Sequence, residues 1–159
     1  MIQLRKVDSK NIWELVALEV NESQRTFVAT NTQRILEAYC AITAGSVAMP
    51  YGIYDGEVPV GFLMIGFGCD DWENPPRIAE GNYSLWRLMI DKRYQGRGYG
   101  KAAITAALDV TRCYPCGKAE YCFLSYEPEN TAAWNLYLSF GFVENGEMDG
   151  EEIVAVLKL

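Results

Sequence analysis

The hydrophobic positions of this chain fall into short runs that suit β-strands and into longer stretches with helical spacing. Ile35, Ala38 and Ile42, for example, recur at intervals of three and four and therefore share one face of a helix. The pattern predicts strands at 3–7, 48–54, 58–67, 83–90, 121–125, 142–147 and 153–159, and helical stretches at about 9–18, 21–44, 98–112 and 130–140.

Polar residues and glycines mark where these elements begin and end. Ser9 is a suitable N-cap for the first helix. Gly45 and Gly141 can stop the second helical stretch and the last helix. Asp55-Gly56 and Asp149-Gly150 each lie between two β runs, which predicts a hairpin at both places.

The order of the elements indicates the class of fold. The polar stretch 70–81, which contains Pro75-Pro76, predicts a loop between the third and fourth strands. The full order is strand, two helices, three strands, helix, strand, helix and two strands, without repeats or linkers. This order predicts one α+β domain over residues 1–159, built on a mixed sheet.

The segment between the strand 83–90 and the next helix is unusual in its glycines. They occupy the alternate positions 96, 98 and 100, directly before the helix begins. Glycine lets the backbone approach a ligand closely and adopt positive φ. The first amides of a helix lack partners and carry partial positive charge. A strand, a glycine loop and a helix start together predict an anion-binding cradle, most naturally for phosphate.

Two common phosphate-binding loops do not fit this spacing. A dinucleotide-binding loop needs Gly-x-Gly-x-x-Gly, whereas the third glycine comes one residue early here. A P-loop needs a glycine five residues before Gly-Lys-Ser/Thr, whereas Gln95 stands there and Ala102 follows Lys101. The ligand is therefore expected to be a different phosphate compound.

The loop resembles the Gln/Arg-x-x-Gly-x-Gly/Ala loop of the GNAT superfamily of acyl-CoA N-acyltransferases. In that family the loop amides hold the pyrophosphate of coenzyme A, so the resemblance implies acetyl-CoA as co-substrate. A glycine-rich turn without a ligand is the alternative. The loop residues that the resemblance assigns to cofactor binding are Gln95, Gly96, Arg97, Gly98, Tyr99, Gly100 and Lys101.

The same resemblance implies how the cofactor lies against the sheet. In GNAT proteins the strand before the loop and the next strand splay apart, and the exposed edge pairs with the pantetheine arm and the acetyl carbonyl. Here that strand ends in Leu88, Met89 and Ile90. The expected fold is a mixed, mostly antiparallel sheet of about seven strands, flanked by about four helices, with a splayed cofactor cleft.

A second segment, 130–142, resembles the GNAT pattern Asn-x-x-Ala-x-x-x-Tyr-x-x-x-Gly-Phe. Asn130, Ala133 and Tyr137 fall on one helical face. Asn130 can cap the helix, contact the cofactor, or do both. Tyr137 is the expected catalytic residue, because a phenol can donate a proton to the thiolate that leaves a thioester. The alternative for Tyr137 is a core residue that packs on the sheet.

Composition excludes several kinds of chemistry. There are no histidines, which excludes histidine metal sites and Ser-His-Asp triads. The sequence predicts no metal cofactor. Lys and Arg number 14 against 21 Asp and Glu, a formal charge of −7 that argues against a nucleic-acid surface. This charge suits a small cationic substrate, although moderate acidity also simply keeps a domain soluble.

Cys113 and Cys116 have the C-x-x-C spacing of some redox sites. A reactive cysteine of that type lies at a helix N-terminus, whereas this pair follows a helix. A single pair is also a weak signal for zinc. We expect both to be turn cysteines.

The acceptor is suggested by a narrower resemblance to bacterial diamine and spermidine/spermine N-acetyltransferases. Those enzymes carry a glutamate on the central strand as base, whereas Trp86 stands at that position here. Glu80, Asp91 and Glu127 are the alternative bases, directly or through water. The matching positions are Gln24, Phe27-Val28-Ala29, Asn31, Glu37-Ala38-Tyr39, 86–91 and 125–130.

The sequence therefore predicts an acetyl-CoA-dependent amine acetyltransferase, with spermidine or spermine as the leading acceptor. Antibiotic amines, protein N-termini and a non-catalytic acyl-CoA-binding domain stay open. No segment reaches the roughly 18 apolar residues of a membrane-spanning helix, and no signal-peptide core follows Met1, so a cytoplasmic protein without membrane partners is expected. The oligomeric state is open, a homodimer included.

Overall fold

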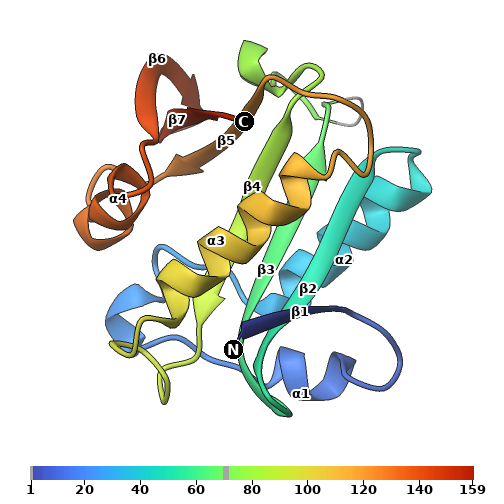
Figure 1. Cartoon of the computed structure of the whole chain (residues 1–159), viewed down its shortest axis with the longest axis vertical. Helices are drawn as coiled ribbons and strands as arrows, with labels where there is room; N and C mark the ends of the chain where they lie inside the picture. The colour runs from blue at the N-terminus through green and yellow to red at the C-terminus, as the bar shows by residue number, and fades with distance from the viewer. Residues whose placement is uncertain (1, 70–71) are drawn as a thin grey trace.

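Figure 1 shows the computed structural model of the chain, which describes residues 2–69 and 72–159. Its strands are β1 (Ile2–Lys6), β2 (Val47–Asp55), β3 (Val58–Phe67), β4 (Tyr83–Ile90), β5 (Tyr121–Tyr126), β6 (Val143–Asp149) and β7 (Glu152–Lys158). Its α-helices are α1 (Ile12–Val16), α2 (Asn31–Thr43), α3 (Tyr99–Arg112) and α4 (Thr131–Leu138), joined by the short 3-10 helices η1 (Glu22–Gln24) and η2 (Arg77–Ala79).

The seven strands form one sheet in the order β1-β2-β3-β4-β5-β7-β6. Neighbouring strands run antiparallel except β4 and β5, which run parallel. The expected mixed, mostly antiparallel α+β fold is therefore confirmed.

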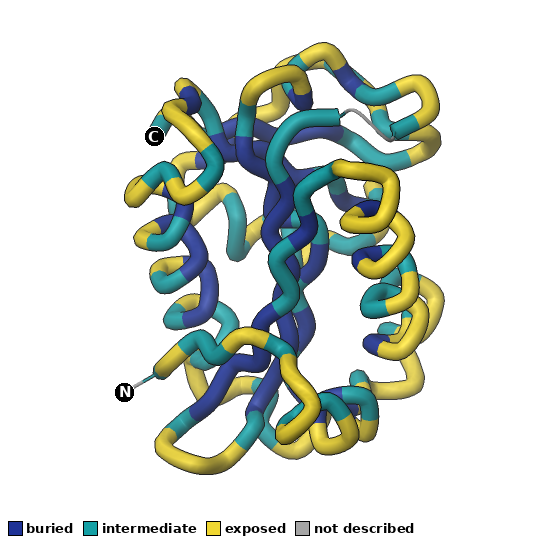
Figure 2. Tube along the Cα trace, turned by 90° about the vertical axis from the view of Figure 1, so that its right-hand side faces the viewer, coloured by how far each residue is buried: buried dark blue, intermediate teal, exposed yellow. Residues whose placement is uncertain are grey.

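Helices cover both faces of the sheet (Figure 1). Leu63 and Ile65 of β3 pack in the cluster that contains α3, whereas Phe62 and Met64 pack with α1 and α2. All four side chains are at 0% exposure, so β3 is apolar on both faces and its sequence is a continuous hydrophobic run. Figure 2 shows these buried central strands between the two helical layers.

The sheet opens between β4 and β5. The two strands pair at Tyr83–Cys122 and Ser84–Phe123, and the rest of β4 pairs with β3 alone. The β3–β4 register shifts so that Met64 faces Arg87 and Ile65 faces Leu85, which leaves Trp86 as a bulge. The expected splay is confirmed, and it leaves the β4 edge from Leu85 onward unpaired within the described sheet.

The first helix begins later than predicted. Its N-cap is Asn11, not Ser9, and Ser9 lies in the preceding turn. Asp8 Oδ1 accepts hydrogen bonds from the amides of Lys10 and Asn11, at 2.8 and 3.3 Å. An Asx-type turn therefore satisfies the amides that Ser9 was expected to serve.

The predicted helical stretch 21–44 is two helices instead of one. Asn21 caps η1, and Thr30 caps α2 by accepting a hydrogen bond from the Gln33 amide at 3.2 Å. Two caps within ten residues interrupt the helix, and the segment 25–30 between them crosses toward β4. Gly45 ends α2 with φ +90°, as predicted.

Two other boundaries differ slightly from the prediction. The helix expected to reach Phe140 ends at Leu138. The predicted loop 70–81 contains η2, while Asp70 and Asp71 lie outside the described residues.

Candidate active site

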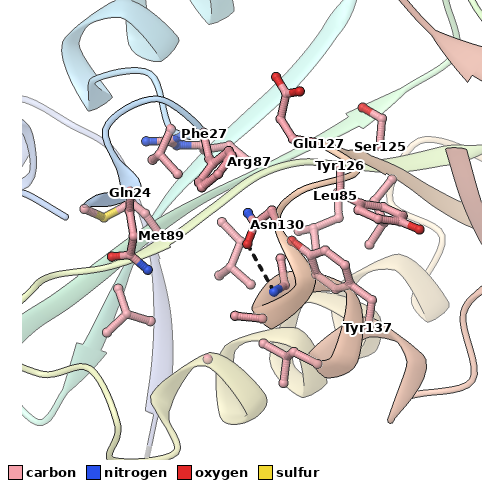
Figure 3. A pocket seen from close by; sticks show the side chains of 18 of the residues that line it. Gln24, Phe27, Leu85, Arg87, Met89, Ser125, Tyr126, Glu127, Asn130 and Tyr137 are labelled. Carbon is pink, nitrogen blue, oxygen red and sulfur yellow. Dashed lines mark hydrogen bonds between the residues drawn. The ribbon is translucent and has the colours of Figure 1, made fainter. Parts of the chain in front are cut away.

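The splay between β4 and β5 opens a cleft of about 830 Å³. Gln24, Phe27 and Met89 lie on one side of it, and Ser125, Tyr126 and Glu127 lie on the other (Figure 3). The glycine loop and α4 also contribute residues to its lining. This is the position in which the sequence predicts a cofactor.

The glycine loop is shaped to accept an anion. Gly96 and Gly98 have φ values of +75° and +82°, which disfavour other residues, and a Cβ added to either would meet no heavy atom within 4 Å. Gly98 is the N-cap of α3 without a side-chain cap, and the first turn has no acidic residue. The first amides of α3 are therefore open beside empty space, and Lys101 adds a positive charge at the cleft. These features fit a pyrophosphate.

Twelve of the thirteen residues predicted to bind cofactor or react line the cleft. Arg97 is the exception, and its guanidinium carbon lies 5.7 Å from the centre of the Tyr94 ring. The twelve are Leu88, Met89, Ile90, Gln95, Gly96, Gly98, Tyr99, Gly100, Lys101, Asn130, Ala133 and Tyr137.

The Gln95 side chain is bound by the protein itself. Its Nε2 donates to the Ile90 carbonyl at 2.9 Å and to Gln24 Oε1 at 2.7 Å. Its Oε1 accepts from Asn21 Nδ2 at 2.7 Å. Both hydrogens of the Gln95 side-chain amide are donated within the protein, so this side chain stabilises the fold at this position.

Tyr137 and Asn130 project from α4 toward the cleft (Figure 3). Asn130 Oδ1 accepts a hydrogen bond from the Ala133 amide at 3.3 Å, so it caps the helix and lines the cleft at once. The Tyr137 ring packs 6.1 Å from the ring of Phe142 and 6.5 Å from that of Tyr126. The Tyr137 side chain therefore both packs against other aromatic residues and lines the cleft.

Burial raises the pKa of Tyr137 to about 12, and the charge of Glu152 adds to the rise, whereas Arg87 opposes it. An ordinary phenol has a pKa of about 10, and no sequence pattern around Tyr137 predicts this rise. The hydroxyl therefore stays protonated at all physiological pH values, and it is a weaker acid than an exposed tyrosine.

Four carboxylates line the cleft, and we call them the carboxylate wall. They are Glu127, Asp149, Glu151 and Glu152. The Ser125 hydroxyl donates to Glu152 and lies 3.4 Å from Asp149 Oδ2. Burial raises the pKa of Asp149. From the sequence, residues 149–150 are expected only to form a turn. The concentration of acidic residues at that turn was the signal that could have identified this wall.

Two arginines line the other wall. Arg87 is only 7% exposed and donates a hydrogen bond to the Ala29 carbonyl. Burial, and then the charge of Arg34, lower the pKa of Arg87 to about 10. Arg34 pairs with Glu37 at 2.6 Å. The buried Nε atoms of both arginines have no partner within the described residues. An arginine within an otherwise apolar strand was the available signal for Arg87.

The three candidate bases lie in different environments. Glu127 lines the cleft, whereas Glu80 and Asp91 are not among its lining residues. Burial raises the pKa of Asp91, but hydrogen bonds from Arg93 and from the Glu19 amide outweigh it, so the net pKa is lowered. A carboxylate held in this way is a poor base. Trp86, at the position where the resemblance led us to expect a glutamate base, lines the cleft.

The cysteine pair lies apart from the cleft. Cys113 is the C-cap of α3, and both thiols are free. Burial raises the pKa of the Cys116 thiol, which makes it less reactive. Within residues 2–69 and 72–159, no cluster of histidine, cysteine, aspartate or glutamate could hold a metal ion.

Comparison with known proteins identifies the family. The Acetyltransferase (GNAT) family matches residues 13–142. The chain belongs to this family. A spermine/spermidine N(1)-acetyltransferase from Bacillus subtilis (strain 168) is 31% identical over 158 residues, which cover 96% of each chain.

Solved GNAT structures agree with the fold. A PaiA N-acetyltransferase from Thermoplasma acidophilum, in complex with coenzyme A, superimposes with a TM-score of 0.69 at 16% identity, over 100% of this chain and 99% of that one. An aminoglycoside acetyltransferase, AAC(6')-Ib, also in complex with coenzyme A, superimposes with a TM-score of 0.77 at 16% identity, over 99% and 95%. None of the described helices is long and apolar enough to cross a membrane.

Proposed function

We propose that this GNAT protein transfers the acetyl group of acetyl-CoA to a primary amine of a di- or polyamine such as spermidine or spermine. One observation carries the proposal: a single cleft joins an open glycine loop, Tyr137 and a wall of four carboxylates. The 31% identity with a spermine/spermidine acetyltransferase supports the choice of acceptor.

The residues around the glycine loop would hold the cofactor, and acetyl-CoA would supply an acetyl thioester. The open amides from Gly96 to Lys101 are suited to its pyrophosphate. The unpaired edge of β4 offers the backbone of Leu88 to Ile90 to an extended pantetheine arm, as an added strand would use it.

The carboxylate wall would bind the acceptor. Four acidic side chains in the cleft attract a cation. The ammonium groups of a polyamine would therefore lie beside these carboxylates and away from Arg34 and Arg87, which repel them. The reacting amine must lose a proton to become a nucleophile. Among Glu80, Asp91 and Glu127, only Glu127 lines the cleft, and we assign it the role of accepting this proton, directly or through water.

Tyr137 would assist the leaving group. The amine nitrogen bonds to the carbonyl carbon, the carbon–sulfur bond breaks, and the phenol hydrogen-bonds to the departing sulfur. Full proton transfer from a phenol of pKa about 12 to a thiolate whose acid has pKa roughly 8.5 is uphill by about 5 kcal/mol. Tyr137 therefore acts mainly by sharing its proton while charge develops, and solvent completes the transfer.

A thiol-release assay across a panel of amines tests the proposal. Spermidine and spermine should turn over faster than kanamycin or a peptide with a free N-terminus. Turnover of kanamycin or the peptide with inert polyamines would overturn the acceptor assignment. Acetyl-CoA binding without turnover of any amine would instead indicate a non-catalytic acyl-CoA-binding domain.

A further inference from the structure

The segment 19–24 is fastened to the segment 91–95, although the two are some seventy residues apart in the chain. Glu19 uses its amide, carbonyl and carboxylate to contact Asp91 and Lys92, at 3.0, 2.7 and 2.7 Å. Asn21 and Gln24 bind the Gln95 side chain, each at 2.7 Å. The glycine loop begins at the next residue after Gln95.

One side of the cleft continues directly from this junction. We call Gln24, Phe27, Val28 and Arg34, which all line the cleft, the acceptor wall. Gln95 holds the wall at Gln24, and Arg87 holds it at the Ala29 carbonyl. The wall is thus joined at Gln24 to the residue directly before the cofactor loop, and at Ala29, within its segment, to β4.

Gln95 is well suited to link these parts. Its amide joins three elements at once: the end of β4 through the Ile90 carbonyl, η1 through Gln24, and the preceding turn through Asn21. Three hydrogen bonds restrict the side chain to one arrangement. A ligand that orders the loop at Gly96 must therefore also restrict Gln95 and the residues bonded to it.

We propose that Gln95 is a positioning residue that couples the cofactor loop to the acceptor wall, so that a cofactor bound at the loop orders residues 20–30. The inference rests on the proposed binding of acetyl-CoA at Gly96 to Lys101. Coupling between two sites is reciprocal, so an acceptor that is bound by the carboxylates and packs against this wall strengthens cofactor binding by the same factor.

Hydrogen–deuterium exchange with coenzyme A as the probe tests this without knowledge of the acceptor. In the wild type, coenzyme A should slow amide exchange at 96–101 and also at 20–30, by about threefold or more at both. In Gln95→Met the protection at 96–101 should remain, and the protection at 20–30 should be lost. Gln24→Met, which breaks the same bond from the wall, should give the same result.

A control variant and the pattern of protection distinguish failure of the coupling through Gln95 from failure of cofactor binding at the glycine loop. Gln3→Met, the same substitution at an exposed position of β1, should leave both protections intact. Protection at 96–101 without protection at 20–30 in the wild type overturns the coupling alone. Protection at 20–30 that survives in Gln95→Met also overturns it. No protection at 96–101 in the wild type would overturn the cofactor assignment and the coupling with it.

Kinetics provide a second readout that a loss of stability alone would not produce. Gln95→Met should raise KM for the amine more than it raises the Kd of coenzyme A. The double variant Gln24→Met/Gln95→Met should raise KM by less than the product of the two single effects, because both substitutions break one shared contact in addition to contacts of their own. Additive effects on the amine KM would contradict a shared bond.

Discussion

The two ends of the cleft are built in different ways. The cofactor end comes from one continuous segment, 88–101, and offers mostly backbone: open amides, glycines and an unpaired strand edge. The acceptor end is assembled from side chains on distant segments, at 24–34, 87, 125–127 and 149–152. Backbone recognition follows from a local motif, whereas side-chain recognition depends on the complete fold.

The ends also differ in charge. The cofactor end combines helix amides with Lys101 and suits an anion. The acceptor end carries carboxylates on one wall and Arg34 and Arg87 on the other. Charges from both walls act on Tyr137: that of Glu152 raises its pKa, and that of Arg87 lowers it. The following predictions test whether each end acts as its construction suggests.

The largest effect is expected where the two ends meet. Tyr137→Phe should lower kcat about 10²- to 10⁴-fold while the Kd of acetyl-CoA changes little. The hydroxyl has no hydrogen-bond partner within the described residues, so thermal unfolding should stay near the wild-type temperature. Steady-state kinetics and calorimetry measure the two constants.

Tyr83→Phe is the matched control for this prediction. Tyr83 is fully buried outside the cleft, and its hydroxyl bonds to the Gly117 carbonyl and the Cys116 amide, each at 2.9 Å. Its loss should cost about 1–3 kcal/mol of stability and leave kcat unchanged. Near-normal kcat in Tyr137→Phe, with chemistry shown to be rate-limiting, would reduce Tyr137 to a packing residue.

The next effect concerns the cofactor end alone. Gly98→Ala should raise the Kd of acetyl-CoA about tenfold or more, because the methyl group occupies the anion space and φ +82° disfavours alanine. Gly56→Ala, at φ +59° in the β2–β3 hairpin, imposes comparable strain away from the cleft. Unchanged affinity in a folded Gly98→Ala protein would remove the loop from cofactor binding.

A smaller effect is expected at the acceptor end. Glu151→Gln should raise KM for spermidine about two- to fivefold, since exposed charge pairs contribute little each. Added salt should raise the wild-type KM and affect the variant less. Glu120→Gln, the same charge change outside the cleft, is the control. An equal KM in Glu151→Gln and the control would argue against a role for the carboxylate wall.

The smallest effect is an absence of change with pH. Because the pKa of Tyr137 is raised to about 12, its acid form persists to higher pH than that of an ordinary phenol. The value of kcat should therefore not fall between pH 8 and about 10.5, where a phenol of pKa about 10 would lose most of its acid form. A decline centred near pH 10 that disappears in Tyr137→Phe would contradict the raised pKa.

The sequence predicted the cofactor end better than the acceptor end for a physical reason. The Gly96–Gly100 spacing and the strand before it are local features, and the structure has them where the pattern indicates. Because the sequence pattern predicts a single helix at 21–44, the irregular segment 25–30 is not recognised from it. Asn21 and Thr30 act as N-caps of two separate helices, and these caps determine where the helical stretch is interrupted. The sequence predicts the hairpin at Asp149-Gly150, but the carboxylate wall also requires this hairpin to pair beside β5, and no local spacing encodes that long-range pairing.

The most direct test of the central claim is an amide chemical-shift titration of the wild type with acetyl-CoA. The largest shifts should occur at Gly96, Gly98, Gly100 and Lys101 and along Leu88–Ile90, with smaller shifts at 20–30. Unchanged shifts at the glycine loop in a protein that binds acetyl-CoA elsewhere, or no shifts at saturating cofactor, would contradict it.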